Sequence, residues 1–268
     1  MHSIVEHGGT LFLAGVTGEG ADVGAQTADI LSKIDALLAQ NGVTKERLLT
    51  AVLYITDLEL RPAANDVWRA WLPEGHAPAR TSIGASTLMP GKLIEIQVTA
   101  ATADSGPITR TGPTANYNAV VEHNGLLHFA GCSMHDETMG MAEQTEGALA
   151  RLSDRLAGSG CSPQHVLSCI VFIDDMDQLP AMNDAYARWK GDGPPPARAL
   201  VCCDLGIGTS FTVMATAATV QFPIERLGEP GGAHGPVRHN GRLYVSGMVG
   251  IVDTDDNPLV NCTFDHQL

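Results

Sequence analysis

The stretch NDVWRAWLPEGHAPAR, residues 65–80, returns as NDAYARWKGDGPPPAR at residues 183–198. The shift is 198 − 80 = 118 positions, and it carries Arg80 onto Arg198 and Trp71 onto Trp189. A period of about one domain indicates the duplication of a whole domain, because solenoid repeats are much shorter. The chain is therefore predicted to contain two similar folded units.

A second repeated motif extends this pattern toward the C-terminus. The segment VEHGGTLFLAG at residues 5–15 returns as VEHNGLLHFAG at 121–131 and as VRHNGRLYVSG at 237–247, each time with a shift of 116 positions. We therefore expect unit 1 at residues 1–104, unit 2 at 107–221 and unit 3 at 224–268. Unit 3 contains only the front of a repeat, as expected for a fragment of a parent with three full units.

The composition is that of an ordinary globular chain, with 44% hydrophobic and 17% charged residues. Its net charge of −14, with no cluster of lysine and arginine, argues against binding to nucleic acid or to anionic membrane surfaces. No apolar run is long enough to span a bilayer, and the first residues lack a signal-like segment. A cytoplasmic location is therefore expected.

The hydrophobic periodicity changes in the same order along each unit. Two short strands around a Gly-Gly or Asn-Gly turn precede an amphipathic helix, a β-rich run, a second helix and two further strands. Each Pro/Gly-rich joint between units is expected to add a short leading strand, near Ile108 and near Ile224. The predicted class is α+β, a β-β-α-β-α-β-β sheet packed on two helices.

The stretch PARTSIGASTLMPGKLIEI, residues 78–96, resembles the signature of the RidA/YjgF family of enamine and imine deaminases. Pro-Ala-Arg, a hydrophobic strand, Leu-x-Pro and Ile-Glu-Ile all match, with Glu95 placed 95 − 80 = 15 positions after Arg80 and Thr81 as a mild departure. The resemblance implies a chorismate-mutase-like fold that assembles as a trimer with ligand clefts between neighbouring subunits. A homo-oligomer, or a pseudo-trimer of units, is expected.

The resemblance also implies that Arg80 holds the carboxylate of a small 2-imino acid while water releases ammonia, without a cofactor or a metal. A planar guanidinium binds a carboxylate in a fixed orientation, whereas a lysine would not orient it. An electrophilic imine then needs a placed water and an acid/base group, a role that suits Glu95. The alternatives without a functional role are a structural ion pair for Arg80 and a solvent-exposed position for Glu95.

No single unit carries the whole set of family residues. In unit 2, Arg198 remains, but the position 198 + 15 = 213 is Val213, so the acid/base candidate is absent there. The early aromatic hydroxyl is matched by Tyr117, and the hydroxyl before the hairpin glycine is matched only by Ser246. Our hypothesis is that a site is assembled across repeats, with Tyr117, Ser246 and Arg198 as substrate-binding residues beside Arg80 and Glu95.

Two classes of function remain open on the sequence alone. The first is a cofactor-free hydrolytic deaminase of small 2-imino or enamino acids of the 2-aminoacrylate type. The second is a non-catalytic member of the same fold that binds a small carboxylate or acts as a scaffold. An enzyme on a larger unsaturated or cyclic acid is a third alternative. All require a small carboxylate as the partner.

Overall fold

The structure is a computed structural model, and it describes residues 3–86, 88–219, 223–227 and 235–248. Of unit 3, only residues 224–227 and 235–248 fall within these ranges. The prediction that unit 3 continues as a repeat beyond residue 248 lies outside the described residues.

Unit 1 forms a six-stranded sheet with two helices. The strands are β1 (Ile4–His7), β2 (Thr10–Leu13), β3 (Val16–Thr17), β4 (Leu48–Ile55), β5 (Ala79–Gly84) and β6 (Ile94–Ala101). Their order is β1-β2-β6-β4-β5, with β3 also paired to β6, and only β4 and β5 run parallel. The helices are α1 (Val23–Gln40) and α2 (Arg61–Trp71), with 3₁₀ turns η1 (Lys45–Arg47) and η2 (Leu58–Leu60).

Unit 2 repeats this arrangement. Its strands are β7 (Thr109–Pro113), β8 (Asn118–His123), β9 (Leu126–Ser133), β10 (Val166–Ile173), β11 (Ala197–Cys202) and β12 (Phe211–Ala218), ordered β11-β10-β12-β9-β8-β7. The helices are α3 (Met141–Gly158) and α4 (Leu179–Lys190), with η3 (Pro163–His165) and η4 (Met176–Gln178). Strands β13 (Ile224–Arg226), β14 (Val237–His239) and β15 (Arg242–Tyr244) of unit 3 form a small third sheet.

The predicted class and element order are confirmed. The Asp22 side chain caps α1 by accepting from the Ala25 amide at 2.8 Å. The helix is amphipathic as predicted, with Ile30, Leu31, Ile34 and Leu38 on its buried face. The helix is followed by Gly42 at φ +66°, a conformation that favours glycine. The leading strands expected near Ile108 and Ile224 are β7 and β13.

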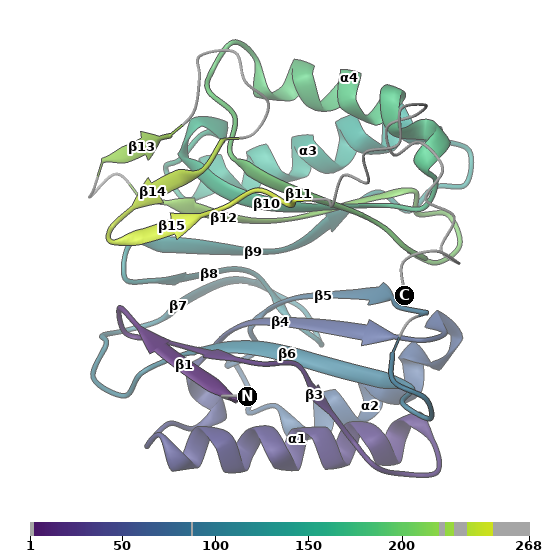
Figure 1. Cartoon of the computed structure of the whole chain (residues 1–268), viewed down its shortest axis with the longest axis vertical. Coiled ribbons are helices and arrows are strands. Elements are labelled where there is room, and N and C mark those ends of the chain that lie inside the picture. The colour runs from purple at the N-terminus through teal and green to yellow at the C-terminus, as the bar shows by residue number, and fades with distance from the viewer. Residues whose placement is uncertain (1–2, 87, 220–222, 228–234, 249–268) are drawn as a thin grey trace, which may run out of the picture.

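The two large sheets face each other across the middle of the molecule. Figure 1 shows α1 and α2 outside one sheet and α3 and α4 outside the other, with β14 and β15 beside the sheet of unit 2. Alternate residues of β4, such as Ala51 and Leu53, pack under the helices of unit 1. The opposite faces of the sheets are therefore turned toward the neighbouring units.

Two arginines at corresponding positions form hydrogen bonds between neighbouring units. Arg110 on β7 donates through Nη2 to the carbonyl oxygens of Glu46 and Leu48 in unit 1, at 2.7 and 3.0 Å. Arg226 on β13 donates in the same way to the carbonyls of Gln164 and Val166, at 2.8 and 2.9 Å. The junction of units 1 and 2 is thus repeated between units 2 and 3.

Replacing Arg110 by methionine is expected to lower the free energy of unfolding by about 2 kcal/mol, because two carbonyl acceptors lose a charged, partly buried donor. Urea unfolding followed by circular dichroism measures this change. Arg69→Met is the matched control, since Arg69 forms only an exposed ion pair with Asp66. Equal effects of the two substitutions would contradict the role assigned to Arg110.

Candidate functional site

Arg80 is a buried cation held by two neighbours on α2. It follows the first residue of β5, and its Nη2 donates to Asn65 Oδ1 at 2.8 Å. Its guanidinium carbon lies 5.2 Å from the centroid of the Trp68 ring, a cation–π arrangement. The residue is 6% exposed, and its Nη1 has no hydrogen-bond partner among the described residues. One side of the guanidinium is therefore fixed and the other is not hydrogen-bonded.

Burial lowers the pKa of Arg80 to about 10, with smaller effects from Tyr117, which raises it, and from Arg61 and Arg69, which lower it. The group therefore remains protonated at neutral pH. No carboxylate forms an ion pair with it in the part of the chain that the structure describes. A buried guanidinium without an anion is costly, because its lost hydration is not compensated. The position is suited to an external carboxylate.

Unit 2 repeats this arrangement around Arg198. Its Nη1 donates to Asn183 Oδ1 at 3.0 Å, and its guanidinium carbon lies 4.8 Å from the centroid of the Tyr186 ring. Asn65 and Asn183 are not among the site residues predicted from the sequence. The structure corrects this, since each amide orients an arginine. Their recurrence at the same 118-residue shift as the arginines was the signal that could have shown it.

Tyr117 of unit 2 lies near the start of β5 in unit 1, where it packs against a cluster that includes Ala79. The Asn118 amide nitrogen and its Nδ2 donate to the carbonyls of Pro78 and Ala77, at 3.0 and 2.6 Å. These bonds attach the start of β8 to the start of β5. Tyr117 immediately precedes this attachment and is close enough to affect the pKa of Arg80.

Ser246 is hydrogen-bonded to the backbone of Arg198. The Arg198 amide donates to Ser246 Oγ at 3.2 Å, and the Gly247 amide donates to the Arg198 carbonyl at 3.0 Å. Ser246 therefore belongs to the junction of units 2 and 3, and Tyr117 to the junction of units 1 and 2. The structure does not place Ser246 beside Arg80.

Glu95 is not brought to Arg80. In the sheet of unit 1, Arg80 is paired with Ala51 of β4, and Glu95 is paired with Tyr54 of the same strand. Residues 51 and 54 lie three positions apart on one strand, so their side chains point to opposite faces of the sheet. Arg80 and Glu95, which are paired with them, therefore also leave opposite faces. The Glu95 carboxylate lies directly against Gly15.

The strand register also corrects the position that replaces this glutamate in unit 2. Tyr54 and Phe172 correspond at a shift of 118, and they are paired with Glu95 and Thr212 respectively. The counterpart of Glu95 is therefore Thr212, at a shift of 212 − 95 = 117, and not Val213. The connection from β11 to β12 is one residue shorter than that from β5 to β6. Counting a fixed 15 positions from Arg198 missed this deletion.

Hydroxyl groups take the place of the carboxylate at the junction of units 1 and 2. Gly131 corresponds to Gly15, and a Cβ atom built on it would lie 2.7 Å from Thr81 Oγ1 and 3.2 Å from Thr212 Cγ2. Two threonines therefore fill the space that Glu95 takes up beside Gly15. Thr81 follows Arg80 in β5, so its side chain leaves the opposite face of that strand, and the side-chain atoms nearest to Gly131 come from hydroxyl residues and not from an acid.

Glu95 lies on the face of this sheet opposite to Arg80, against Gly15. The neighbouring Ala14 and Gly15 line a cavity of about 450 Å³ together with residues of α1. No arginine lines this cavity in the described part of the structure. The predicted pair of catalytic residues is thus divided between two different sides of unit 1.

Within the residues that the structure describes, no group of three or more histidine, cysteine, aspartate or glutamate side chains is arranged to hold a metal ion. None of the helices in the same ranges has the length and apolar character needed to cross a membrane.

Comparison with known proteins identifies the family. The family model described as Endoribonuclease L-PSP matches the chain twice, at residues 2–102 and at 108–218. The chain belongs to this family. The relatives that it matches in sequence include proteins named as RutC family members, and the resemblance to the RidA/YjgF family is confirmed, as is its tandem arrangement.

The relatives are about the length of one unit. The RutC family protein YoaB of Escherichia coli strain K12 is 37% identical over 99 residues, which cover 37% of this chain and 87% of YoaB. A solved structure of NMB1025, a YjgF family member from Neisseria meningitidis, is 37% identical and covers 38% of this chain and 87% of its own, with a TM-score of 0.37. Rv2704 from Mycobacterium tuberculosis is 30% identical, with a TM-score of 0.36, and the match covers 37% of this chain and 85% of Rv2704.

Proposed function

We propose that the protein binds a small 2-imino or 2-oxo acid at the junction of units 1 and 2, with Arg80 holding its carboxylate. The observation that supports this is the buried guanidinium, held by Asn65 and Trp68, whose Nη1 has no partner among the described residues. A carboxylate that replaced the missing counter-charge would form strong, charge-assisted hydrogen bonds. Nη1 is enclosed, so the surrounding side chains must move when the ligand enters.

A hydrolytic deaminase is the second candidate, favoured by the hydroxyl groups of Tyr117, Thr81 and Thr212 at this junction. Water would add to the imine carbon, and the resulting carbinolamine would lose ammonia to leave a 2-oxo acid. Hydroxyl groups can position the water, but they are weak acids and bases near neutral pH. Turnover at this junction is therefore expected to be slow, and independent of Glu95.

Arg80→Gln is expected to weaken the binding of 2-oxobutanoate, a stable 2-oxo acid, by about 10- to 100-fold. The loss corresponds to charge-assisted hydrogen bonds with a net value of about 1.5–3 kcal/mol. Isothermal titration calorimetry measures the affinity. Glu95→Gln is the matched control and should change it less than about twofold, because Glu95 leaves the other face of the sheet. An unchanged affinity in Arg80→Gln would refute the proposed site.

Ammonia release from enzymatically generated 2-aminoacrylate separates the two candidates. Release that is lost in Arg80→Gln but retained in Glu95→Gln would support a deaminase at the junction of units 1 and 2. Binding without release would support the carboxylate-binding protein. Release that requires Glu95 but not Arg80 would place the reaction on the other side of unit 1 and contradict both.

A further inference from the structure

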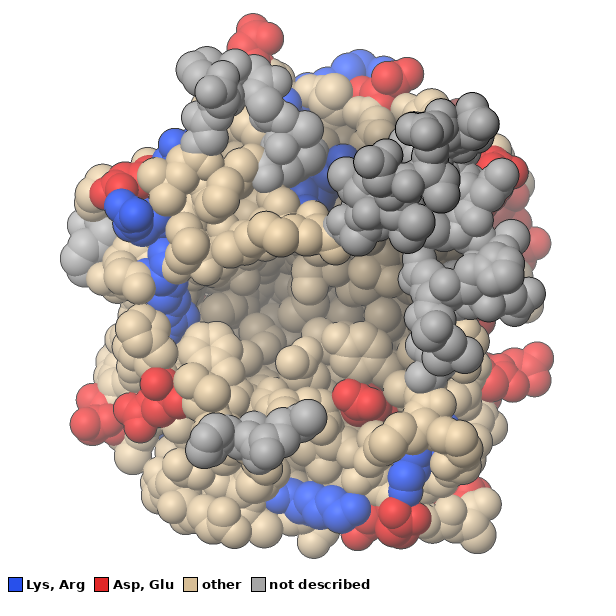
Figure 2. Space-filling view, in the orientation of Figure 1, with Lys and Arg blue, Asp and Glu red and all other residues tan. Residues whose placement is uncertain are grey.

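A second cavity, of about 220 Å³, lies where the sheets of the three units meet. Its wall comes from β2, β4 and β6 of unit 1, from β9, β10 and β12 of unit 2, and from β15 of unit 3. Figure 2 shows the molecule hollowed between β15 and the strands of unit 1, with mainly uncharged residues in the hollow. We call it the axial cavity, because all three units contribute to its wall. Neither Arg80 nor Arg198 lines it, so it is separate from the sites at these two arginines.

The hairpin repeats contribute matching positions around the axial cavity. Shifts of 116 place Phe12, His128 and Tyr244 at corresponding positions, and all three line it. The position two residues earlier is Thr10 in unit 1, Leu126 in unit 2 and Arg242 in unit 3. Unit 3 therefore adds a cation where the other units have a hydroxyl or an apolar side chain.

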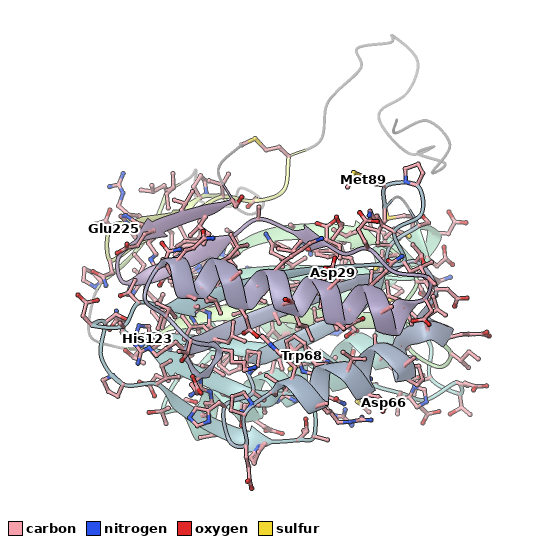
Figure 3. All side chains as sticks on the ribbon, turned by 90° about the horizontal axis from the view of Figure 1, so that it is seen from below. Asp29, Asp66, Trp68, Met89, His123 and Glu225 are labelled. Atoms are coloured by element: carbon pink, nitrogen blue, oxygen red, sulfur yellow. The ribbon has the colours of Figure 1, made fainter. Side chains whose placement is uncertain are left out.

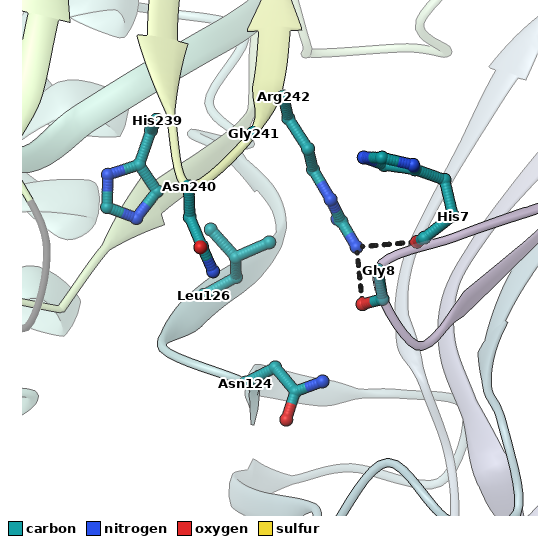
Figure 4. Close-up of a pocket in the computed structure, with 8 residues that line it drawn as sticks. All are labelled: His7, Gly8, Asn124, Leu126, His239, Asn240, Gly241 and Arg242. Atoms are coloured by element: carbon teal, nitrogen blue, oxygen red, sulfur yellow. Dashed lines mark hydrogen bonds between the residues drawn. The ribbon is translucent and has the colours of Figure 1, made fainter.

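Arg242 is anchored to unit 1. Its Nη2 donates to the carbonyls of His7 and Gly8, each at 3.1 Å, and to Thr10 Oγ1 at 2.6 Å. Figure 4 shows the side chain reaching from its own hairpin to the turn at His7 and Gly8. Its guanidinium carbon also lies 5.5 Å from the centroid of the Phe12 ring. Thr10 and Phe12 line the axial cavity, so the contacts with them hold the cation at its wall, whereas His7 and Gly8 line the separate cavity drawn in Figure 4.

Among the described residues, no acid pairs with this charge. The lining of the axial cavity contains one arginine and no carboxylate, and none of the ion pairs in the described part of the chain includes Arg242. Burial, with a smaller effect of Arg242, lowers the pKa of His128 to about 3, so this imidazole is neutral at pH 7. The cavity is therefore positive inside a chain of net charge −14.

Most of the exposed surface of the wall is nevertheless apolar, with hydrophobic side chains from Phe12, Val52, Ile170 and Met214. The polar residues that also line it are Thr50, Gln97, Thr99, Ser168 and Thr216. The volume equals that of roughly seven water molecules in the liquid, enough for a ligand of about ten non-hydrogen atoms.

We propose that the axial cavity binds a small hydrophobic carboxylate, with its carboxylate at Arg242 and Thr10 and its apolar body between Phe12 and Ile170. The site takes an anion because its cation has no counter-charge among the described residues, and it takes an apolar body because most of the exposed surface of its wall is apolar. It differs from the junction sites in having an arginine supplied by the hairpin of unit 3.

Benzoate is a suitable probe, and benzamide is its neutral isostere. In an Arg80→Gln/Arg198→Gln background, which removes both junction arginines, calorimetry should show about one benzoate bound per chain. Arg242→Gln in this background should weaken benzoate binding at least tenfold. Arg238→Gln should leave it unchanged, because Arg238 lies on the same hairpin but forms an exposed ion pair with Glu225. Benzamide should bind more weakly than benzoate in the parent background.

A second variant tests whether Arg242→Gln weakens binding only because the hairpin of unit 3 is displaced. Ile170→Trp fills the axial cavity from the sheet of unit 2 without removing a contact of Arg242, and it should also abolish benzoate binding. Equal affinity in the Arg242→Gln and Arg238→Gln proteins would overturn the proposal. So would tight binding in Ile170→Trp, or benzamide binding as tight as that of benzoate.

Discussion

Trp68→Ala is expected to lower the free energy of unfolding by about 3–5 kcal/mol, the largest stability effect we predict. Trp68 is fully buried among the core residues of unit 1, and its Nε1 donates to the Asn116 carbonyl at 2.9 Å. Figure 3 shows it on α2, at the covered side of the sheet. The substitution would leave a cavity, break a bond to unit 2 and remove the aromatic face beneath Arg80.

Trp71→Ala is the matched control for this prediction. Trp71 lies one turn away on the same helix, with its ring centroid 5.5 Å from that of Trp68, but it is only partly buried. Its Nε1 donates to Asp35, a partly exposed partner within unit 1. Chemical denaturation should show a clearly smaller loss for Trp71→Ala. A loss as large as that of Trp68→Ala would show that the position of Trp68 between two units adds nothing.

The repeated fold could be predicted because its determinants are local. The apolar spacing in α1 and α3, the turn glycines and the β-rich runs of β4 and β10 each act within a few residues. A shift that repeats over a domain-sized period then sets the boundaries of the units. These features do not depend on which strand lies beside which.

The grouping of the site residues could not be predicted in the same way. Whether Arg80 and Glu95 share a face depends on their registers with β4, and fifteen residues that include a loop separate them. The sequence distance alone therefore does not show that they lie on opposite faces. The hypothesis that Tyr117 and Ser246 act across repeats came from which unit had kept which residue. In the structure, Tyr117 packs against a cluster that includes Ala79, next to Arg80, and Ser246 accepts a hydrogen bond from the Arg198 amide.

Installing a glutamate at position 212 is expected to raise the rate of imine hydrolysis on the order of 100-fold, since a positioned acid/base group contributes about 10²–10⁴-fold. Thr212 holds the register position of Glu95, and Gly131 lies beside it as Gly15 lies beside Glu95. Because Thr81 Oγ1 fills part of the space, the substitution is best made with Thr81→Ala. Unit 2 already has an alanine at the matching position 199.

The decisive comparison is between Thr81→Ala/Thr212→Glu and Thr81→Ala/Thr212→Gln. Glutamine has nearly the same shape as glutamate but cannot exchange a proton, so packing changes affect both proteins while acid/base chemistry affects only one. Ammonia release at saturating 2-aminoacrylate measures turnover, and 2-oxobutanoate affinity measures binding. Equal turnover in the two proteins, with binding intact, would mean that the junction of units 1 and 2 orients a carboxylate without placing its imine carbon within reach of residue 212. A gain with glutamate alone would show that a single register position separates a binding junction from a catalytic one.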